Sequence, residues 1–127
     1  MADMKTPLNR VRGLGSAKEG TDHFWVQRLT AVANIPLVIF FAFSIVSLSG
    51  APYADVTAYF GNPIVTVLML LVVLSVVWHM RLGMQVVIED YVHSELTKFA
   101  LMMGNTFFCI FVGLASAVAL LKISFGG

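Results

Sequence analysis

The chain has 127 residues, of which 58% are hydrophobic and only 12% are charged, and its formal net charge is +1. A soluble domain is typically about a quarter charged, so this composition indicates a small integral membrane protein and excludes an ordinary soluble enzyme domain. The near-zero net charge gives no sign of nucleic-acid binding. The single cysteine, Cys109, lies in an apolar segment. We interpret it as a packing residue, because one thiol makes neither an intramolecular disulfide nor a metal site.

The first segment, residues 1–27, is polar and carries both basic and acidic side chains. A secretory signal would place about 7–15 apolar residues close to the N-terminus, and the acidic residues disagree with a mitochondrial transit peptide. We therefore predict direct insertion into a bacterial inner membrane or an equivalent energy-conserving membrane, with this segment on the cytoplasmic side. Its first 20 residues favour irregular or partly ordered structure on the membrane surface or on a partner.

Three long runs in the rest of the chain are apolar, and these runs are residues 29–49, 64–88 and 99–121. About 20 apolar residues span the hydrocarbon core of a bilayer as a helix. The runs therefore predict an all-α membrane protein with three transmembrane helices in a membrane domain at residues 28–122. The segment between the first two spans, residues 52–63, predicts a short loop.

The basic residues indicate the orientation of these spans. Five of them precede the first span, and these are Lys5, Arg10, Arg12, Lys18 and Arg28, whereas the loop after that span has no Lys or Arg. Loops rich in Lys and Arg stay in the cytoplasm. We therefore predict a cytoplasmic N-terminus, a cytoplasmic loop between the second and third spans, and a periplasmic C-terminus.

His79 is the one histidine inside the predicted spans. An ionisable group at membrane depth is costly and marks a functional site by default. It is either an axial ligand of haem iron, with Gly83 one turn away clearing space for the haem plane, or a histidine that hydrogen-bonds a neighbouring helix. Since the other two predicted spans contain no histidine, a bis-histidine haem needs a second chain. Met102 or Met103 as an internal second ligand is the alternative.

Asp90 follows His79 by 11 residues, close to three helical turns, so the two share one face of a helix. Beside Asp90, the phenol of Tyr91 could donate a hydrogen bond to a quinone carbonyl while the carboxylate relays a proton. From the residues alone we favour ordinary interfacial placement of Asp90 and Tyr91. His23 and His93 lie near the same boundary, and we favour solvated side chains over proton shuttles there.

Two arginines could pair with haem propionates. Arg81 is two residues from His79, about 200° around a helix, so it points to a different face and could instead extend its charge to the lipid headgroups. Arg28, at the cytoplasmic start of the first span, is an equally good partner. The sequence contains no phosphate-binding loop, no dinucleotide-binding glycine pattern and no zinc-protease motif.

The order and spacing of several residues resemble the pattern of a known protein family. Phe24…Arg28-x-Thr30, three spans, and then His79-x-x-x-Gly83-Met84-x-x-x-x-x-Asp90-Tyr91-Val92 is similar to the smaller hydrophobic membrane-anchor subunit (D type, a cytochrome b556 anchor) of succinate dehydrogenase, or complex II. The resemblance covers roughly residues 21–121, and its specific part is the His79 to Tyr91 spacing.

The resemblance implies a set of roles. Such a subunit packs with a second three-helix cytochrome b anchor and shares one haem b with it, so His79 would be this chain's axial ligand to iron. Tyr91 would hydrogen-bond ubiquinone with Asp90 beside it. Arg28 would lie near the haem propionates and the quinone pocket.

The resemblance also implies partners. An iron–sulfur subunit and a flavoprotein subunit would dock on the cytoplasmic side and pass electrons from succinate, an intermediate of the tricarboxylic acid cycle, to ubiquinone. The chain would then be a subunit of the electron-transport enzyme and not an enzyme by itself. Two alternatives are the anchor of a fumarate reductase and a small non-redox membrane subunit used in assembly or transport.

Overall fold

The structure is a computed structural model and describes residues 6–13 and 19–126. These residues form five helices, which are α1 (Pro7–Val11), α2 (Glu19–Leu48), α3 (Tyr53–Gly61), α4 (Pro63–Tyr91) and α5 (Glu95–Ser124). The described part of the chain contains no strand. The predicted all-α fold is therefore confirmed. The expectation for the first 20 residues falls mostly outside the described residues.

Three helices are long and apolar enough to cross a membrane, as the sequence predicted, and these are Thr21–Leu48 within α2, all of α4 and all of α5. Each is longer than the predicted span, and α2 begins at Glu19 instead of near residue 29. Hydropathy detects only the part of a helix inside the hydrocarbon core, about 30 Å thick. A helix of 29 residues such as α4 is about 43 Å long, so its ends extend into the interface.

The prediction of a loop at residues 52–63 is wrong, because Tyr53–Gly61 forms helix α3. Asn62 ends α3 and begins α4, where its side chain accepts a hydrogen bond of 2.9 Å from the backbone N–H of Ile64. Pro63 then occupies the first position of α4, where its missing N–H costs nothing. Flanking prolines and polar residues resemble loop signals, but here they separate two helices.

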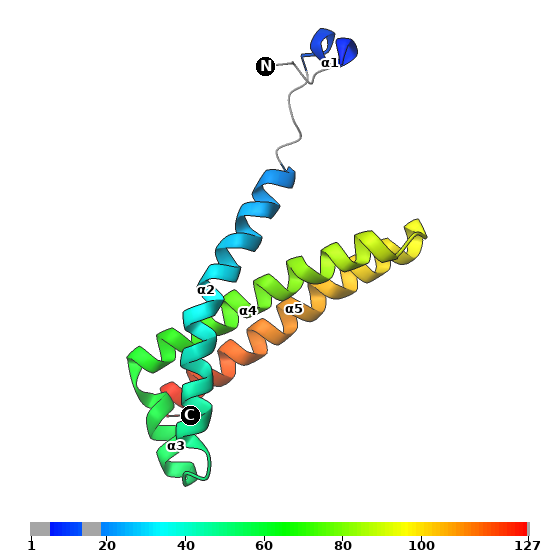
Figure 1. Ribbon diagram of the computed structural model, residues 1–127. Helices are drawn as coiled ribbons and strands as arrows, with labels where there is room; N and C mark the ends of the chain where they lie inside the picture. Colours follow the sequence, from blue (N-terminus) through cyan, green and yellow to red (C-terminus); the bar gives the residue numbers. More distant parts are fainter. Residues whose placement is uncertain (1–5, 14–18, 127) are drawn as a thin grey trace.

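Helix α4 occupies the middle of the molecule, with α2 packed on one side and α5 on the other (Figure 1). The buried residues reflect this position. Helix α4 buries Thr66, Met69, Val72, Ser75, Leu82 and Ile88, whereas Cys109 is the buried residue of α5 and Ser44 that of α2. Most of the apolar surface of α2 and α5 is left uncovered by the chain itself, where lipid or other subunits can contact it.

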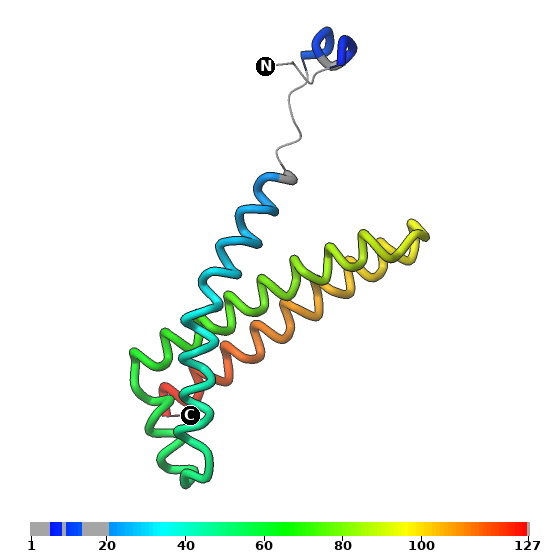
Figure 2. The backbone as a smooth tube through the Cα atoms, viewed as in Figure 1, coloured from blue at the N-terminus to red at the C-terminus, as the bar shows by residue number. Residues whose placement is uncertain are grey.

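The two ends of the bundle differ. At one end α3 packs on α4 and α5, and the end of α5 lies beside it, whereas the start of α2 lies at the opposite end (Figure 2). Side-chain hydroxyls link this α3 end: Ser44 to Tyr59 at 2.6 Å and Thr66 to Ser124 at 2.9 Å. From their crossing, α2 and α4 diverge towards the start of α2 and the end of α4 (Figure 1).

Candidate functional site

Two contacts between side chains join α2 to α4 near their crossing, and the Ser75 hydroxyl also donates a hydrogen bond of 3.4 Å to the backbone carbonyl oxygen of Thr30. The hydroxyl of Thr30 lies 3.0 Å from Nδ1 of His79, and the hydroxyl of Ser75 donates a hydrogen bond of 2.7 Å to Oδ1 of Asn34. In each helix the two residues are four positions apart and therefore share a face. Because the helices run antiparallel, Thr30 faces His79 where Asn34 faces Ser75. The pair of contacts sets the register of the two helices.

The structure bears on one of the two interpretations of His79, the hydrogen bond to a neighbouring helix, and the haem-ligand interpretation stays a prediction. Nδ1 of His79 contacts a neighbouring helix through Thr30. Its Nε2 makes no hydrogen bond within the described part of the chain. The buried side-chain atoms without a partner are in His23 and Gln27, so Nε2 of the half-buried His79 is unpaired but not fully buried. A metal ligand needs one ring nitrogen with an accessible lone pair, and Nε2 is the ring nitrogen of His79 that no described residue occupies.

Gly83 lies one turn beyond His79 and faces α2. A Cβ atom built on Gly83 would lie 3.9 Å from Nε2 of Gln27, so α2 already approaches the space that the missing side chain leaves. The clearing predicted from the glycine is therefore bordered by Gln27.

Two further side chains of α2 belong to this region. Among the described residues, Nε2 of His23 and Oε1 of Gln27 are the buried side-chain atoms that lack a hydrogen-bond partner. His23, Gln27 and Thr30 follow one another by four and three residues, so they form one stripe along α2. Buried polar atoms are nearly always paired. The described residues therefore leave the hydrogen-bonding capacity of these two atoms unused.

The earlier start of α2 places one more histidine on this helix. The helix begins at Glu19, and the segment long and apolar enough to cross the membrane begins at Thr21, so His23 belongs to α2 although it precedes the apolar run 29–49. That run itself contains no histidine. His23 is seven residues from Thr30, about 10 Å along the helix, so His79 remains the histidine at the helix crossing.

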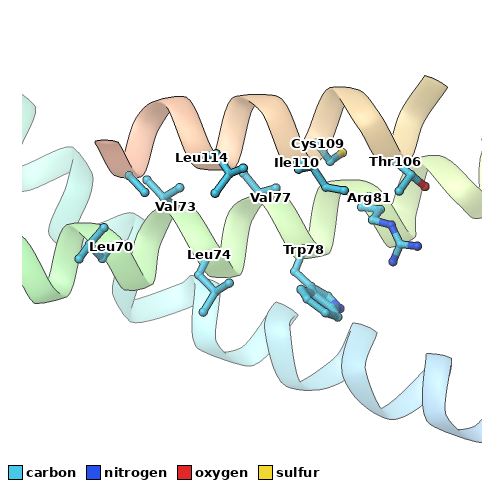
Figure 3. A pocket seen from close by; sticks show the side chains of 12 residues that line it. Leu70, Val73, Leu74, Val77, Trp78, Arg81, Thr106, Cys109, Ile110 and Leu114 are labelled. Atoms are coloured by element: carbon cyan, nitrogen blue, oxygen red, sulfur yellow. The ribbon is translucent and has the colours of Figure 1, made fainter. Parts of the chain in front are cut away.

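The two arginines lie in different surroundings. The guanidinium of Arg28 is exposed on α2 and sits 4.8 Å from the centroid of the Phe24 ring, in a cation–π contact. Arg81 is half-buried and lines an apolar groove of about 600 Å³ between α4 and α5, beside Thr106 (Figure 3). Arg81 and His79 therefore face different neighbours, as their separation around the helix predicts.

The groove in Figure 3 also shows how α4 divides its side chains. Leu74 and Trp78 point from α4 towards α2, and Val77 lies between α4 and α5. The candidate second ligands Met102 and Met103 belong to α5, whereas His79 contacts α2.

Asp90 and Tyr91 lie in the last turn of α4, and both side chains are exposed, Tyr91 to 78%. Neither makes a side-chain hydrogen bond to another described residue. Asp90 is about 16 Å along the helix from His79, so the chain does not bring the two groups together. His93 is also exposed, in the short connection Val92–Ser94 between α4 and α5.

The sequence was compared with known families and curated proteins. The family described as succinate dehydrogenase/fumarate reductase transmembrane subunit matches residues 2–114. The chain belongs to this family. It is 32% identical over 102 residues to the succinate dehydrogenase hydrophobic membrane anchor subunit of Paracoccus denitrificans, covering 80% of this chain and 79% of that protein.

Two other anchor subunits are similar over much of their length. The succinate dehydrogenase membrane anchor subunit of Reclinomonas americana is 32% identical over 84 residues, which is 64% of this chain and 70% of that protein. The hydrophobic membrane anchor subunit of Rickettsia bellii (strain RML369-C) is 27% identical over 117 residues, or 92% of this chain and 94% of that protein. The resemblance predicted from the His79 to Tyr91 motif is thus confirmed at the level of the family.

The donor set of this anchor fits a haem shared with another chain. Within the described residues, no group of three or more His, Cys, Asp or Glu side chains is arranged to hold a metal ion, but an axial site needs only one nitrogen from each side. Nε2 of His79 offers that nitrogen, and the unpaired atoms of His23 and Gln27 offer polar contacts near it. Sequence reasoning missed Gln27, although its spacing from Thr30 was the available signal.

Proposed function

We propose that this chain is the membrane-anchor subunit of a succinate:ubiquinone oxidoreductase, that it holds haem b together with a partner subunit, and that it forms part of the ubiquinone-reduction site. The observation that carries the proposal is the ring of His79, held at Nδ1 by Thr30 and open at Nε2. The names of the relatives support succinate dehydrogenase. An anchor of a fumarate reductase, which the family also includes, is the second candidate, and the family match favours both over a non-redox assembly or transport subunit.

In the haem half of the site, His79 provides the axial nitrogen. Haem b bound there supplies a one-electron carrier inside the membrane. Arg28 lies on the same helix as Thr30 and can neutralise a propionate. Arg81 opens into the α4–α5 groove, so extending its charge towards the headgroups suits it better. Gly83 has no side chain, so the helical turn next to His79 leaves space for the haem plane.

In the quinone half of the site, Tyr91 and Asp90 act at the end of α4. Reducing ubiquinone to ubiquinol consumes two electrons and two protons. The Tyr91 hydroxyl donates a hydrogen bond to a quinone carbonyl, and the Asp90 carboxylate passes protons from the cytoplasm. Because both side chains are exposed in this chain, other subunits complete the pocket around them.

The partners follow from what the chain leaves uncovered. A second three-helix cytochrome b anchor covers apolar surface and supplies the other axial histidine. An iron–sulfur subunit and a flavoprotein subunit dock on the cytoplasmic side, near the end of α4, and deliver electrons from succinate. The membrane is the bacterial inner membrane, with the N-terminus in the cytoplasm and the C-terminus in the periplasm, as the basic residues before the first span predict.

The haem assignment is tested by the visible spectrum of the purified complex reduced with succinate. The wild-type complex should show a reduced b-type haem band, and His79→Leu should abolish it because no other residue replaces the ligand. His93→Leu is the matched control, since His93 is exposed in the α4–α5 connection, and it should keep the band. A band that survives His79→Leu would refute the ligand assignment.

The quinone assignment is tested with two exposed tyrosines at opposite ends of the bundle. Tyr91→Phe removes one hydroxyl and should impair succinate-dependent quinone reduction while leaving succinate oxidation by a soluble dye intact. Tyr53→Phe, in the α3 region, should change neither rate. If Tyr91→Phe lowered both rates together, Tyr91 would serve assembly and not quinone reduction.

A further inference from the structure

We propose that Thr30 is a positioning residue for His79: its hydroxyl holds the imidazole in the tautomer with the proton on Nδ1, and so keeps Nε2 as an open lone pair facing the iron. The inference rests on the proposed haem site. It adds a residue from a different helix, and it states which hydrogen bond prepares the ligand before any haem is bound.

The geometry at Thr30 brings three acceptor or donor atoms around one hydroxyl. Its Oγ1 lies 2.9 Å from the carbonyl oxygen of Val26, 3.0 Å from that of Gln27 and 3.0 Å from Nδ1 of His79. The two carbonyl oxygens can only accept a hydrogen bond, whereas Nδ1 can donate or accept depending on the tautomer.

Counting protons decides between the two tautomers. A threonine hydroxyl has one proton. If it donates to a carbonyl of its own helix, Nδ1–H of His79 donates to the hydroxyl oxygen, and two hydrogen bonds form. If it donates to Nδ1 instead, only one bond forms. Nε2 lacks a partner in the described chain in both tautomers, so the difference between them is one hydrogen bond, which contributes about 1 kcal/mol. The first arrangement is therefore favoured.

Donation from Nδ1–H has a chemical consequence for the opposite nitrogen. Hydrogen bonding of the second ring nitrogen orients a metal-binding histidine and raises its basicity. A more basic Nε2 stabilises ferric over ferrous iron, so the contact lowers the reduction potential of the haem. It also fixes the plane of the imidazole, because the donor and acceptor belong to two packed helices. The neighbouring Ser75–Asn34 contact holds the same register without touching His79.

The experiment uses the intact purified complex and compares four substitutions. Thr30→Val removes the hydroxyl at almost unchanged volume, Thr30→Ala removes it without risk of overpacking, and Thr30→Ser keeps it. Ser75→Ala is the matched control, because it deletes the hydrogen bonds of Ser75 to the Asn34 side chain and to the Thr30 carbonyl oxygen but leaves the contact between the Thr30 hydroxyl and Nδ1 of His79 in place. The measurements are haem content, the midpoint potential of the haem, and the low-spin electron paramagnetic resonance signal, which depends on the orientation of the axial imidazole planes.

Thr30→Val and Thr30→Ala should raise the midpoint potential, shift the resonance signal and lower haem affinity about 10- to 100-fold, the range for losing such an outer contact. Thr30→Ser and Ser75→Ala should match the wild type in potential and signal. If the complex with Thr30→Val fails to assemble, the comparison of Thr30→Ala, which lacks the hydroxyl, with Thr30→Ser, which keeps it, still tests the proposal. Wild-type spectra in Thr30→Ala, or equal shifts in Thr30→Ser and Thr30→Ala, would overturn the proposal.

The outcome is separable from the haem assignment itself. If His79→Leu abolishes the haem band while the Thr30 variants leave potential and signal unchanged, His79 is the ligand and Thr30 does not position it. If the wild-type complex contains no haem b, both proposals are overturned together.

Discussion

The two sides of α4 join their neighbours by different means. Towards α2, the side chains of His79 and Ser75 meet polar partners on the facing helix. Towards α5, the backbone comes close where Val77 packs over Gly113, on which a Cβ atom would lie 3.5 Å from a methyl group of Val77. In lipid, helices associate through close packing and interhelical hydrogen bonds and not through the hydrophobic effect, and α4 relies on polar side chains on one side and on close packing on the other.

The difference is not that the α5 side lacks polar groups. The side chain of Asn105 donates a hydrogen bond of 3.0 Å to the backbone carbonyl of Arg81, and the thiol of Cys109 points to Asn105 at 3.5 Å. These groups have partners within the chain. On the α2 side, by contrast, His23, Gln27 and His79 each keep a nitrogen or oxygen atom without a partner among the described residues. Among the described residues, the buried side-chain atoms without a hydrogen-bond partner therefore belong to the α2 side and not to the α5 side.

The largest effect should come from placing a charge on the packed side. Cys109 is 1% exposed, so Cys109→Asp would bury a carboxylate between α4 and α5. A charged residue at the centre of a membrane helix costs about 2.5–3.5 kcal/mol. We expect little assembled complex on a native gel, with Cys109→Ser close to wild type. Normal assembly of Cys109→Asp would show that the α5 side also has bonding capacity to spare.

A large side chain at Gly113 should have the next largest effect. A Cβ atom fits there, but the remaining atoms of a leucine would displace Val77. Overpacking a tight interface costs about 1–3 kcal/mol, so Gly113→Leu should lower the temperature at which the complex dissociates while its haem spectrum stays unchanged. A changed spectrum would mean that the two sides of α4 are coupled.

On the polar side, Ser75→Ala should have a small effect. It removes the 2.7 Å hydrogen bond to Asn34, and interhelical hydrogen bonds in membranes average about 0.6 kcal/mol. A thermal melt of the complex should show a slight decrease in stability. A loss as large as that of Gly113→Leu would show that register, and not only binding, depends on this side.

The smallest effect should come from Gly113→Ala. The added methyl group would make ordinary contacts with Val77, at 3.5 and 3.9 Å, and alanine favours a helix over glycine by up to about 1 kcal/mol. The same melt should show unchanged or slightly raised stability. A clear decrease would place the helices closer together than the structure has them.

Much of this fold was predictable from the sequence because a membrane-spanning helix appears in the sequence as a long apolar run with few charged residues. The three spans were predicted, whereas hydropathy alone does not show that α2 begins ten residues before the first apolar run, because residues 19–28 are helical but too polar for hydropathy to detect. Helix α3 was missed for a similar reason: Pro52 and Pro63 resemble loop signals, although one precedes a helix and the other begins one.

The candidate site was predictable only in part. His79 stood out because an ionisable group deep in a span is rare. Its contact with Thr30 was not predicted. The periodicity of a helix indicates which of its residues share a face, but not which residues of a second helix lie opposite them. The matching four-residue spacings, Thr30 to Asn34 and Ser75 to His79, were the available signal. The surroundings of Asp90 and Tyr91 could not be predicted, because other subunits provide them in the proposed complex.

The hydroxyl pairs at the α3 end have a consequence for the order in which the protein is made. Ser44 meets Tyr59 soon after both have been synthesised, and Thr66 meets Ser124 once the last helix is inserted. These contacts need no other subunit, so the α3 end can close as soon as the chain leaves the ribosome and enters the bilayer. The diverging end has no such contacts that close it. In the proposed complex, a newly inserted chain would therefore have its α3 end already closed when the other subunits and the haem reach the diverging end.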